Sequence, residues 1–269
     1  MRVSILLIGS ELTKGIVRDV NGAWLAEVIT SMGHEVERIL VVPDREEAII
    51  DALNYALRNS DVVITTGGLG FTEDDITLEC VCKALGLSQK LCPEVAEEVR
   101  DRYVRLGLRV PKNYTKAAML PEGSRVIRPA GTVPGVHITF GGKEIFVLPG
   151  YPAEVRHMFE TYIRSRLEER GVAAVVEAEV EGMTEEEVEE AVRGLARDYP
   201  GAYVKTHAGK PVRVTILMRA GSREELERLA REVADGVRMR LPIASLTIRN
   251  VGRGCHESSR FYSLIGDDT

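Results

Sequence analysis

The chain has 269 residues, of which 44% are hydrophobic and 28% charged, and its net charge is −6. These proportions are typical of a globular protein that forms one large domain or two smaller ones. The acidic charge argues against a general nucleic-acid binder, and no apolar run is long enough for a membrane-spanning helix. Val3 to Ile8 is too short an apolar stretch for a signal peptide, so we expect a cytoplasmic protein without a membrane partner.

Two compositional details add to this description. Gln89 is the sole glutamine, and glutamate and arginine are abundant, a bias typical of proteins from hot environments. The cysteines Cys80, Cys82, Cys92 and Cys255 fit no common zinc spacing, so we expect buried free thiols.

The first part of the chain alternates strand and helix patterns. Such an order predicts a mostly parallel sheet with right-handed crossovers. Asn21 is expected to cap the first helix and Gly33 to end it, with Trp24 in the apolar stripe rather than in a ligand site. The expected strands are Val3–Ile8, Val36–Val42 and Val62–Ile64 with Thr65 and Thr66, and the expected helices are Asn21–Met32 and Arg45–Asn59.

A glycine-rich turn follows the third strand. Gly67, Gly68 and Gly70 allow tight backbone geometry there and keep side chains away from a ligand, while the helix that starts near Ile76 directs its free N–H groups and its dipole toward the turn. The carboxylates of Asp74 and Asp75 beside such an anion site would repel an anion unless a cation lay between them. The stretch therefore suggests a phosphate-bearing ligand bridged by a divalent metal; the alternative is a plain loop with an acidic helix cap.

The remainder of the first domain contains short strands and a second candidate anion site. Gly141-Gly142 marks a hairpin, and Pro149-Gly150 ends a strand before a helix opened by Pro152. His157 within that helix is expected to be a packing or surface residue. The expected helices are Ile76–Leu85, Pro93–Leu106, a short one or a turn over Lys112–Met119, and Pro152 to about Arg170, and the expected strands are Val126-Ile127, Val136–Phe140 and Glu144–Leu148.

After Gly171 the pattern restarts, which predicts a small separate α+β domain. We place the first domain at 1–170, the second at 171–249 and a loose tail at 250–269, where an isolated Cys255-His256 pair is no metal site. The second domain is expected to contain strands Val175–Val180, Tyr203–Thr206, Val212–Met218 and Ser245–Ile248, and helices Thr184–Arg197 and Ser222–Met239.

Five segments in this order resemble the molybdopterin-binding domain family, and within it the amino-terminal domain of CinA-type proteins. The resemblance covers about residues 1–170 and implies an α/β, mostly parallel, doubly wound sheet. The small domain resembles the KH-like second domain of CinA-type proteins, but it has no Gly-x-x-Gly loop, so RNA binding is not expected. CinA-type proteins continue into a deamidase domain, which we do not expect in this sequence, so its activity is not inferred here. The segments are Thr65–Thr77, Ile8–Leu12 with Gly15 and Asn21, Val41–Asp44, Gly131–Gly135 and Leu148–Pro152.

The resemblance also implies roles for individual residues. Asp44 and Asp75 would ligate or orient a divalent cation, with Mg2+ or Mn2+ favoured by carboxylate ligands, and Asp74 and Glu11 are second candidates for the catalytic groups. Phe71 replaces a proline that often follows the family's glycine loop. The residues implied to bind phosphate are Gly9, Ser10, Thr66, Gly67, Gly68, Gly70 and Thr72; Asn113 and Lys116 would belong to a lid; Thr132, Gly135, Pro149, Gly150 and Pro152 would shape the side of the base or pterin. Glu11 and Lys116 also fit solvated surface residues.

Three functions follow from these inferences. The resemblance implies hydrolysis of ADP-ribose to AMP and ribose 5-phosphate, or binding or adenylylation of molybdopterin. The third possibility is a sensor that binds a nucleotide or pterin without catalysis and assembles through its second domain. A homodimer is the expected assembly, because symmetric dimers are the commonest closed oligomers.

Overall fold

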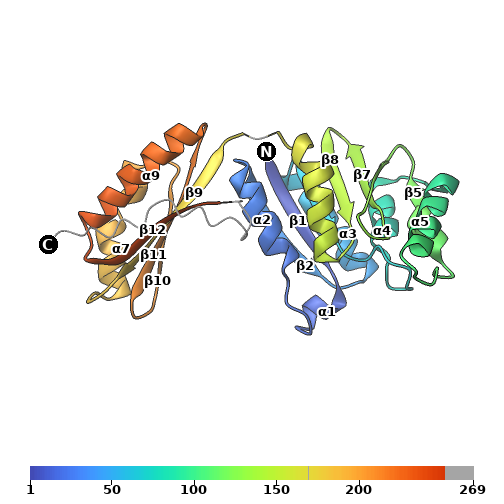
Figure 1. Ribbon diagram of the computed structural model, residues 1–269, viewed down its shortest axis with the longest axis horizontal. Helices are drawn as coiled ribbons and strands as arrows, with labels where there is room; N and C mark the ends of the chain where they lie inside the picture. Colours follow the sequence, from blue (N-terminus) through green and yellow to red (C-terminus); the bar gives the residue numbers. More distant parts are fainter. Residues whose placement is uncertain (169, 252–269) are drawn as a thin grey trace. The chain divides into compact units, whose positions relative to one another are not determined.

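A computed structural model describes residues 1–168 and 170–251 (Figure 1). The chain forms two compact units. The first contains Met1–Ala26 and Glu35–Glu168, and the second contains Glu27–His34 together with the described residues from 170 onward. The expected tail lies outside the described residues apart from Asn250 and Val251, and so does the Cys255-His256 pair.

A six-stranded sheet forms the centre of the first unit, with the strand order β2-β1-β3-β8-β7-β6. Strands β1, β2, β3 and β8 are parallel, whereas β7 and β6 run antiparallel to their neighbours. This mostly parallel sheet confirms the predicted fold class. The strands are β1 (Arg2–Ile8), β2 (Glu35–Val42), β3 (Val62–Thr66), β6 (Arg125–Ile127), β7 (Gly135–Phe140) and β8 (Lys143–Leu148).

Helices cover both faces of this sheet. On one face, apolar residues of α3, α4 and α5 pack with Leu6, Val63 and Val147 in one hydrophobic core. On the other face Trp24 of α2 is half-buried and packs edge-on against the buried Phe159, with ring centroids 5.5 Å apart. Its ring therefore packs against the core, as predicted, without being fully buried. The helices are α1 (Ser10–Thr13), α2 (Asn21–Ser31), α3 (Glu46–Asn59), α4 (Thr77–Leu85), α5 (Pro93–Arg105) and α6 (Pro152–Met158), with short 3-10 helices at Tyr114–Ala118 and Arg164–Arg166 and a π-helical turn at Phe159–Ile163.

Some local predictions for the first unit were wrong. Asn21 does not cap α2; the Asp19 carboxylate accepts hydrogen bonds from the backbone N–H groups of Asn21 and Gly22, which frees the Asn21 amide for other contacts. The helix from Pro152 changes to π and 3-10 geometry after Met158 and ends at Arg166. A two-stranded ribbon of β4 (Gln89–Leu91) and β5 (Met119–Pro121) was not predicted, because three-residue strands carry no clear alternation.

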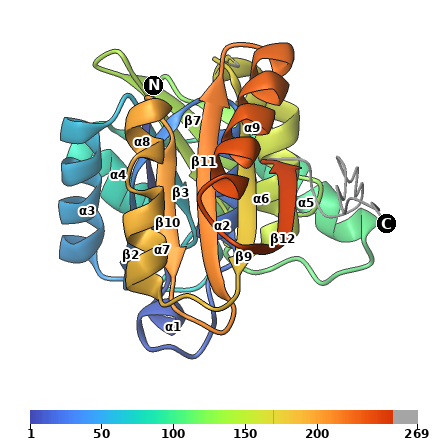
Figure 2. The same cartoon turned by 90° about the vertical axis from the view of Figure 1, so that its left-hand side faces the viewer.

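The second unit contains a four-stranded antiparallel sheet in the order β10-β11-β9-β12. The helices α7, α8 and α9 lie next to this sheet (Figure 2). Thr184 forms the predicted capping box with Glu187, and Ser222 caps α9. The helix expected over Thr184–Arg197 is interrupted near Gly194. The elements are β9 (Val172–Val180), α7 (Glu185–Val192), α8 (Leu195–Asp198), β10 (Tyr203–His207), β11 (Val212–Ala220), α9 (Arg223–Arg238) and β12 (Ile243–Asn250).

Two of the predicted free thiols are buried in the structure. Cys80 and Cys82 are buried free thiols, as predicted, and burial raises the pKa of each to about 11. Cys92 is half-buried, and Cys255 lies outside the described residues. Within the described ranges, no helix has the length and apolarity needed to cross a bilayer.

Candidate functional site

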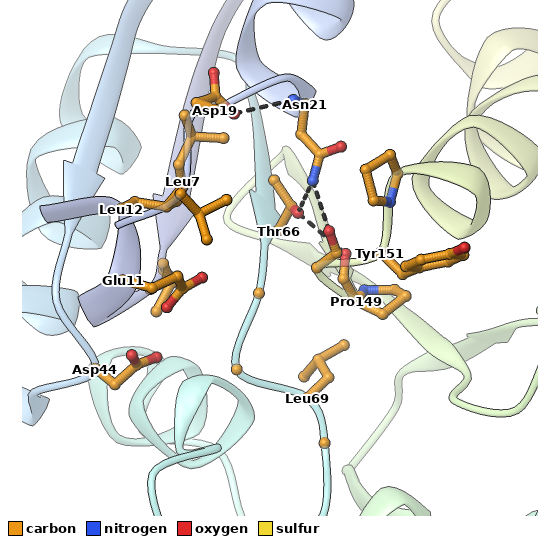
Figure 3. A pocket seen from close by; sticks show the side chains of 18 of the residues that line it. Leu7, Glu11, Leu12, Asp19, Asn21, Asp44, Thr66, Leu69, Pro149 and Tyr151 are labelled. Atoms are coloured by element: carbon orange, nitrogen blue, oxygen red, sulfur yellow. Dashed lines mark hydrogen bonds between the residues drawn. The ribbon is translucent and has the colours of Figure 1, made fainter. Parts of the chain in front are cut away.

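A cavity of about 430 Å³ lies where the four parallel strands of the first unit end (Figure 3). The residues that follow β1, β2, β3 and β8 all contribute to its wall, because the carboxyl ends of parallel strands meet at one edge of the sheet. Of the residues expected to form the site, those that line it are Gly9, Glu11, Asp44, Thr66, Gly67, Gly68, Gly70, Asp74, Asp75, Pro149, Gly150 and Pro152.

The glycine turn after β3 is held tightly against the sheet and α4. Gly67 donates its N–H to the Leu148 carbonyl, and its φ of +105° excludes most side chains. Thr77 donates its hydroxyl to the Gly67 carbonyl and its N–H to the Gly68 carbonyl. Gly67 therefore serves the turn, and its N–H is not free for an anion.

The next three backbone N–H groups are free. Those of Gly68, Leu69 and Gly70 make no hydrogen bond with any residue in the described part of the chain, although Leu69 is only 8% exposed. All three residues line the cavity. Successive unpaired N–H groups in a turn form an anion-binding concavity, so the glycine turn has the donors that a phosphate needs.

Asp44 and Ser10 fix one another. The Ser10 N–H donates to Asp44 Oδ2 at 2.7 Å, and the Asp44 N–H donates to the Ser10 hydroxyl at 3.1 Å. Asp44 lines the cavity, while Ser10 is not part of its wall. Ser10 thus orients the Asp44 carboxylate, and the other carboxylate oxygen, Oδ1, has no hydrogen bond to a described residue.

Thr72 holds the second pair of carboxylates. Its N–H donates to Asp75 Oδ2 at 2.9 Å, and its hydroxyl lies within hydrogen-bond distance of both Asp74 and Asp75. Lys116 donates to the Thr72 carbonyl at 2.7 Å. Thr72 is not part of the cavity wall, so its contacts orient Asp75, which contributes to that wall.

Lys116 borders a neighbouring cavity, and the other expected residues lie away from the main one. The smaller cavity, of about 130 Å³, shares Gly68, Gly70 and Asp75 with the first. Asn113 is exposed, and Gly135 is buried in β7, where a side chain would meet Met158. The structure does not bring Asn113, Thr132 or Gly135 to either cavity wall; Val133 and Pro134 lie there instead.

Phe71, at the position where the family often has proline, packs edge-on against Tyr103 with ring centroids 5.9 Å apart. It also packs against the core on that face of the sheet. Its ring belongs to the core and to neither cavity wall among the described residues. The replacement of proline is therefore compatible with the fold.

The sequence did not reveal several cavity residues. The amide of Asn21 donates to the Thr66 hydroxyl at 3.1 Å and to the Gly150 carbonyl at 2.8 Å, joining the ends of β3 and β8 (Figure 3). Arg18 and Tyr151 also line the cavity. Arg18 lies in a loop without hydrophobic periodicity, and no sequence motif predicted that it would reach a ligand.

The wall is strongly acidic. It contains the carboxylates of Glu11, Asp19, Asp44, Asp74 and Asp75 and one cationic side chain, that of Arg18. Across the described residues, no three His, Cys, Asp or Glu side chains are grouped so as to hold a metal ion.

The comparisons with known proteins agree with this architecture. The family described as a probable molybdopterin binding domain matches residues 4–169. The chain belongs to the molybdopterin-binding domain family. Within this family it is CinA-like: the CinA-like protein of Dictyoglomus turgidum is 34% identical over 246 residues, which cover 90% of this chain and 60% of that protein.

Two further proteins are similar to this chain of the molybdopterin-binding domain family. A protein of Aeropyrum pernix is 41% identical over 247 residues, covering 88% of this chain and 92% of the relative. The crystal structure of CinA from Thermoplasma acidophilum, described as of unknown function, is 31% identical with a TM-score of 0.56, covering 61% of this chain and 96% of that one. These relatives come from thermophiles, in keeping with the composition.

Replacement of Thr72 should change the titration of Asp74. The hydrogen bond from Thr72 holds the pKa of Asp74 below its usual 3.8, with smaller contributions from its own backbone N–H and from Lys116. Because the folded-state pKa is lowered, this contact stabilises the fold above the ordinary aspartate pKa and ceases to do so as the pH falls through the lowered value. In Thr72→Val we expect the pKa of Asp74 to rise toward 3.8, measured by carboxyl-carbon NMR; an unchanged pKa would contradict the assignment.

Proposed function

We propose that the first unit hydrolyses the diphosphate of a nucleotide in a reaction that depends on a divalent cation, with ADP-ribose converted to AMP and ribose 5-phosphate. The observation that carries this proposal is the meeting of two features in one cavity. Three free N–H groups, from Gly68 to Gly70, lie beside the carboxylates of Asp44 and Asp75. Phosphate oxygens need such donors, and carboxylates at the same place make sense when a cation separates them from the phosphate.

The donor set fits the cation that the family implies. Asp44 and Asp75 each have one carboxylate oxygen fixed by the protein, through Ser10 and Thr72 respectively. The other oxygen of each accepts no hydrogen bond from the described residues, which leaves it available as a hard oxygen ligand. A bound Mg2+ or Mn2+ would neutralise phosphate charge and lower the pKa of a water molecule.

The protein's own groups then have separate tasks. The glycine turn binds and orients the phosphate, so that the reacting groups are positioned before the reaction begins. Glu11 is exposed, but its carboxylate lies against Gly9 at the end of β1 and borders the cavity. This position suits a general base that takes a proton from water.

Molybdopterin binding or adenylylation is the second candidate, favoured by the description of the matching family. The third is a sensor that binds without catalysis. All three functions would use the same cavity. Hydrolysis or adenylylation would change the ligand, whereas a sensor would release it unchanged.

Incubation with ADP-ribose and a series of divalent ions, followed by product chromatography, tests the proposal. We expect AMP and ribose 5-phosphate in equal amounts and no product after chelation of the metal. Recovery of intact ADP-ribose from a saturated, metal-loaded protein would exclude the hydrolase and favour the sensor. Turnover of a pterin ligand but not of ADP-ribose would favour the second candidate.

The assembly is a separate prediction. The second unit has its own sheet and core, and we assign no catalytic group to it, so dimerisation is a natural use for it. We expect a homodimer in light scattering at micromolar concentration. A monomeric mass under those conditions would refute this.

A further inference from the structure

Arg18 is the one cationic side chain among the described residues that line the cavity. It is exposed, and it makes no ion pair or hydrogen bond with any described residue, although several carboxylates line the same cavity. Some other arginines of the described chain do form ion pairs, as in Arg128–Glu98 at 3.0 Å and Arg240–Asp198 at 2.7 Å. The nearest carboxylate in sequence, Asp19, instead caps α2. A guanidinium without a partner at the wall of an acidic cavity is available to a ligand.

The loop that carries Arg18 is anchored beside the cavity. The Asp19 carboxylate holds the first N–H groups of α2, and the Asn21 amide is bonded to Thr66 and Gly150 at the ends of β3 and β8. Figure 3 shows Asp19 and Asn21 together above Thr66, on the wall of the cavity. These contacts hold the residues next to Arg18 in place without a ligand, so little ordering is needed when an anion binds.

We propose that Arg18 binds a phosphate of the ligand, and that the carboxylates around it make the cavity select diphosphates that are esterified at both ends over nucleotides with a terminal phosphate. This inference rests on the proposed function for the presence of a diphosphate. The planar guanidinium matches two phosphate oxygens at once.

The selectivity follows from the balance of charge. A terminal phosphate carries about 1.5 to 2 negative charges at neutral pH, whereas a phosphate esterified on both sides has a single ionisable oxygen. ADP and ATP therefore carry more negative charge than ADP-ribose. The carboxylates of Glu11, Asp44, Asp74 and Asp75 repel that extra charge, and Arg18 is the cavity's one side chain that offsets it.

Titration calorimetry with Mg2+ and ADP-ribose, ADP or ATP, at a temperature low enough that no product forms during the titration, tests the inference. We expect the wild-type protein to bind ADP-ribose most tightly. Arg18→Gln should weaken ADP-ribose binding by about tenfold, the effect of one lost charge-assisted contact, and should weaken ADP and ATP binding by more. Arg18→Lys should be intermediate, because it keeps the charge but loses the paired hydrogen bonds. The loss should shrink at high salt.

Arg58→Gln is the matched control. Arg58 is also exposed, but it lies in the last turn of α3, which leads to the amino end of β3, away from the cavity edge of the sheet. Its affinities should equal those of the wild type, and thermal melts of both variants verify that they are folded.

Each outcome supports or overturns the inference. Wild-type affinities in Arg18→Gln would overturn the role of Arg18, and wild-type binding of ATP as tight as that of ADP-ribose would overturn the selectivity. Failure of the wild type to bind any of the three nucleotides would also overturn the inference. Binding of ADP-ribose with the predicted effect of Arg18→Gln, but without hydrolysis, would contradict the proposed function alone.

Discussion

Asp75→Asn is expected to keep the fold and to lose metal-dependent turnover by about a hundredfold or more, because loss of an ion ligand removes several kcal/mol of charge stabilisation at the phosphate. Asparagine has nearly the same volume and can still accept the N–H of Thr72, which donates to Asp75 Oδ2 at 2.9 Å. The substitution removes the negative charge and little else. Steady-state rates at several Mg2+ concentrations, together with a thermal melt, measure the effect.

Asp51→Asn is the control for this experiment. Asp51 is exposed on α3 and does not line the cavity, so its removal should leave the rate and its metal dependence unchanged. An Asp75→Asn protein with the wild-type rate at saturating metal would remove Asp75 from the site.

Substitutions in the glycine turn should have the largest effect on stability. A β-carbon at Gly67 would lie 2.0 Å from the Ile8 carbonyl oxygen, and one at Gly68 would lie 2.2 Å from the Thr77 hydroxyl. Both residues have positive φ, +105° and +66°, which β-branched side chains resist. We expect Gly68→Val to lose roughly 1–3 kcal/mol of stability from backbone strain. Gly67→Ala should lose at least as much, because the atom that its β-carbon would meet, the Ile8 carbonyl oxygen, belongs to the backbone and cannot rotate away.

Gly150→Ala separates stability from binding. Gly150 is exposed, its φ is not positive, and the closest atom to an added β-carbon is the Gly67 Cα at 3.5 Å, an ordinary contact. It lines the cavity, so the methyl group should reduce nucleotide affinity while the melting temperature stays near that of the wild type.

Melting temperature and nucleotide affinity measured on the three variants distinguish the roles of the glycines. Unchanged stability in Gly67→Ala would contradict the geometry of the turn. Full affinity in a destabilised but folded Gly68→Val would show that the side-chain space at this residue is not used by the ligand. The anion site would then rest on the backbone N–H groups of Leu69 and Gly70.

Much of the architecture could be predicted from local patterns. The apolar run of β1, the β-branched run of β3, the helix stops at Gly33 and Gly86 and the hairpin at Gly141-Gly142 all agree with the structure. Periodicity and turn residues act over a few positions, so they can be recognised without long-range contacts. The short strands β4 and β5 were missed because each depends on its partner.

The candidate site was only partly predictable. Asp44, Asp75 and the glycines follow strands, and the end of a parallel strand is a known ligand position. Ser10 and Thr72 were expected to touch phosphate, whereas they orient Asp44 and Asp75 through hydrogen bonds. Gly135 was expected at the ligand but is buried in β7 against Met158. These placements depend on which side of a loop faces the cavity, which local sequence does not specify.

By itself, the sequence determined the family, the order of elements and the acidic, glycine-rich character of the strand ends, since these properties belong to short continuous segments. The tertiary structure decided which polar groups are free. It paired the Gly67 N–H with Leu148, used Asp19 as a helix cap and left Arg18 without a partner in the described chain. Whether a donor or a charge is available to a ligand depends on contacts between residues far apart in the chain, and these exist only once the sheet has formed.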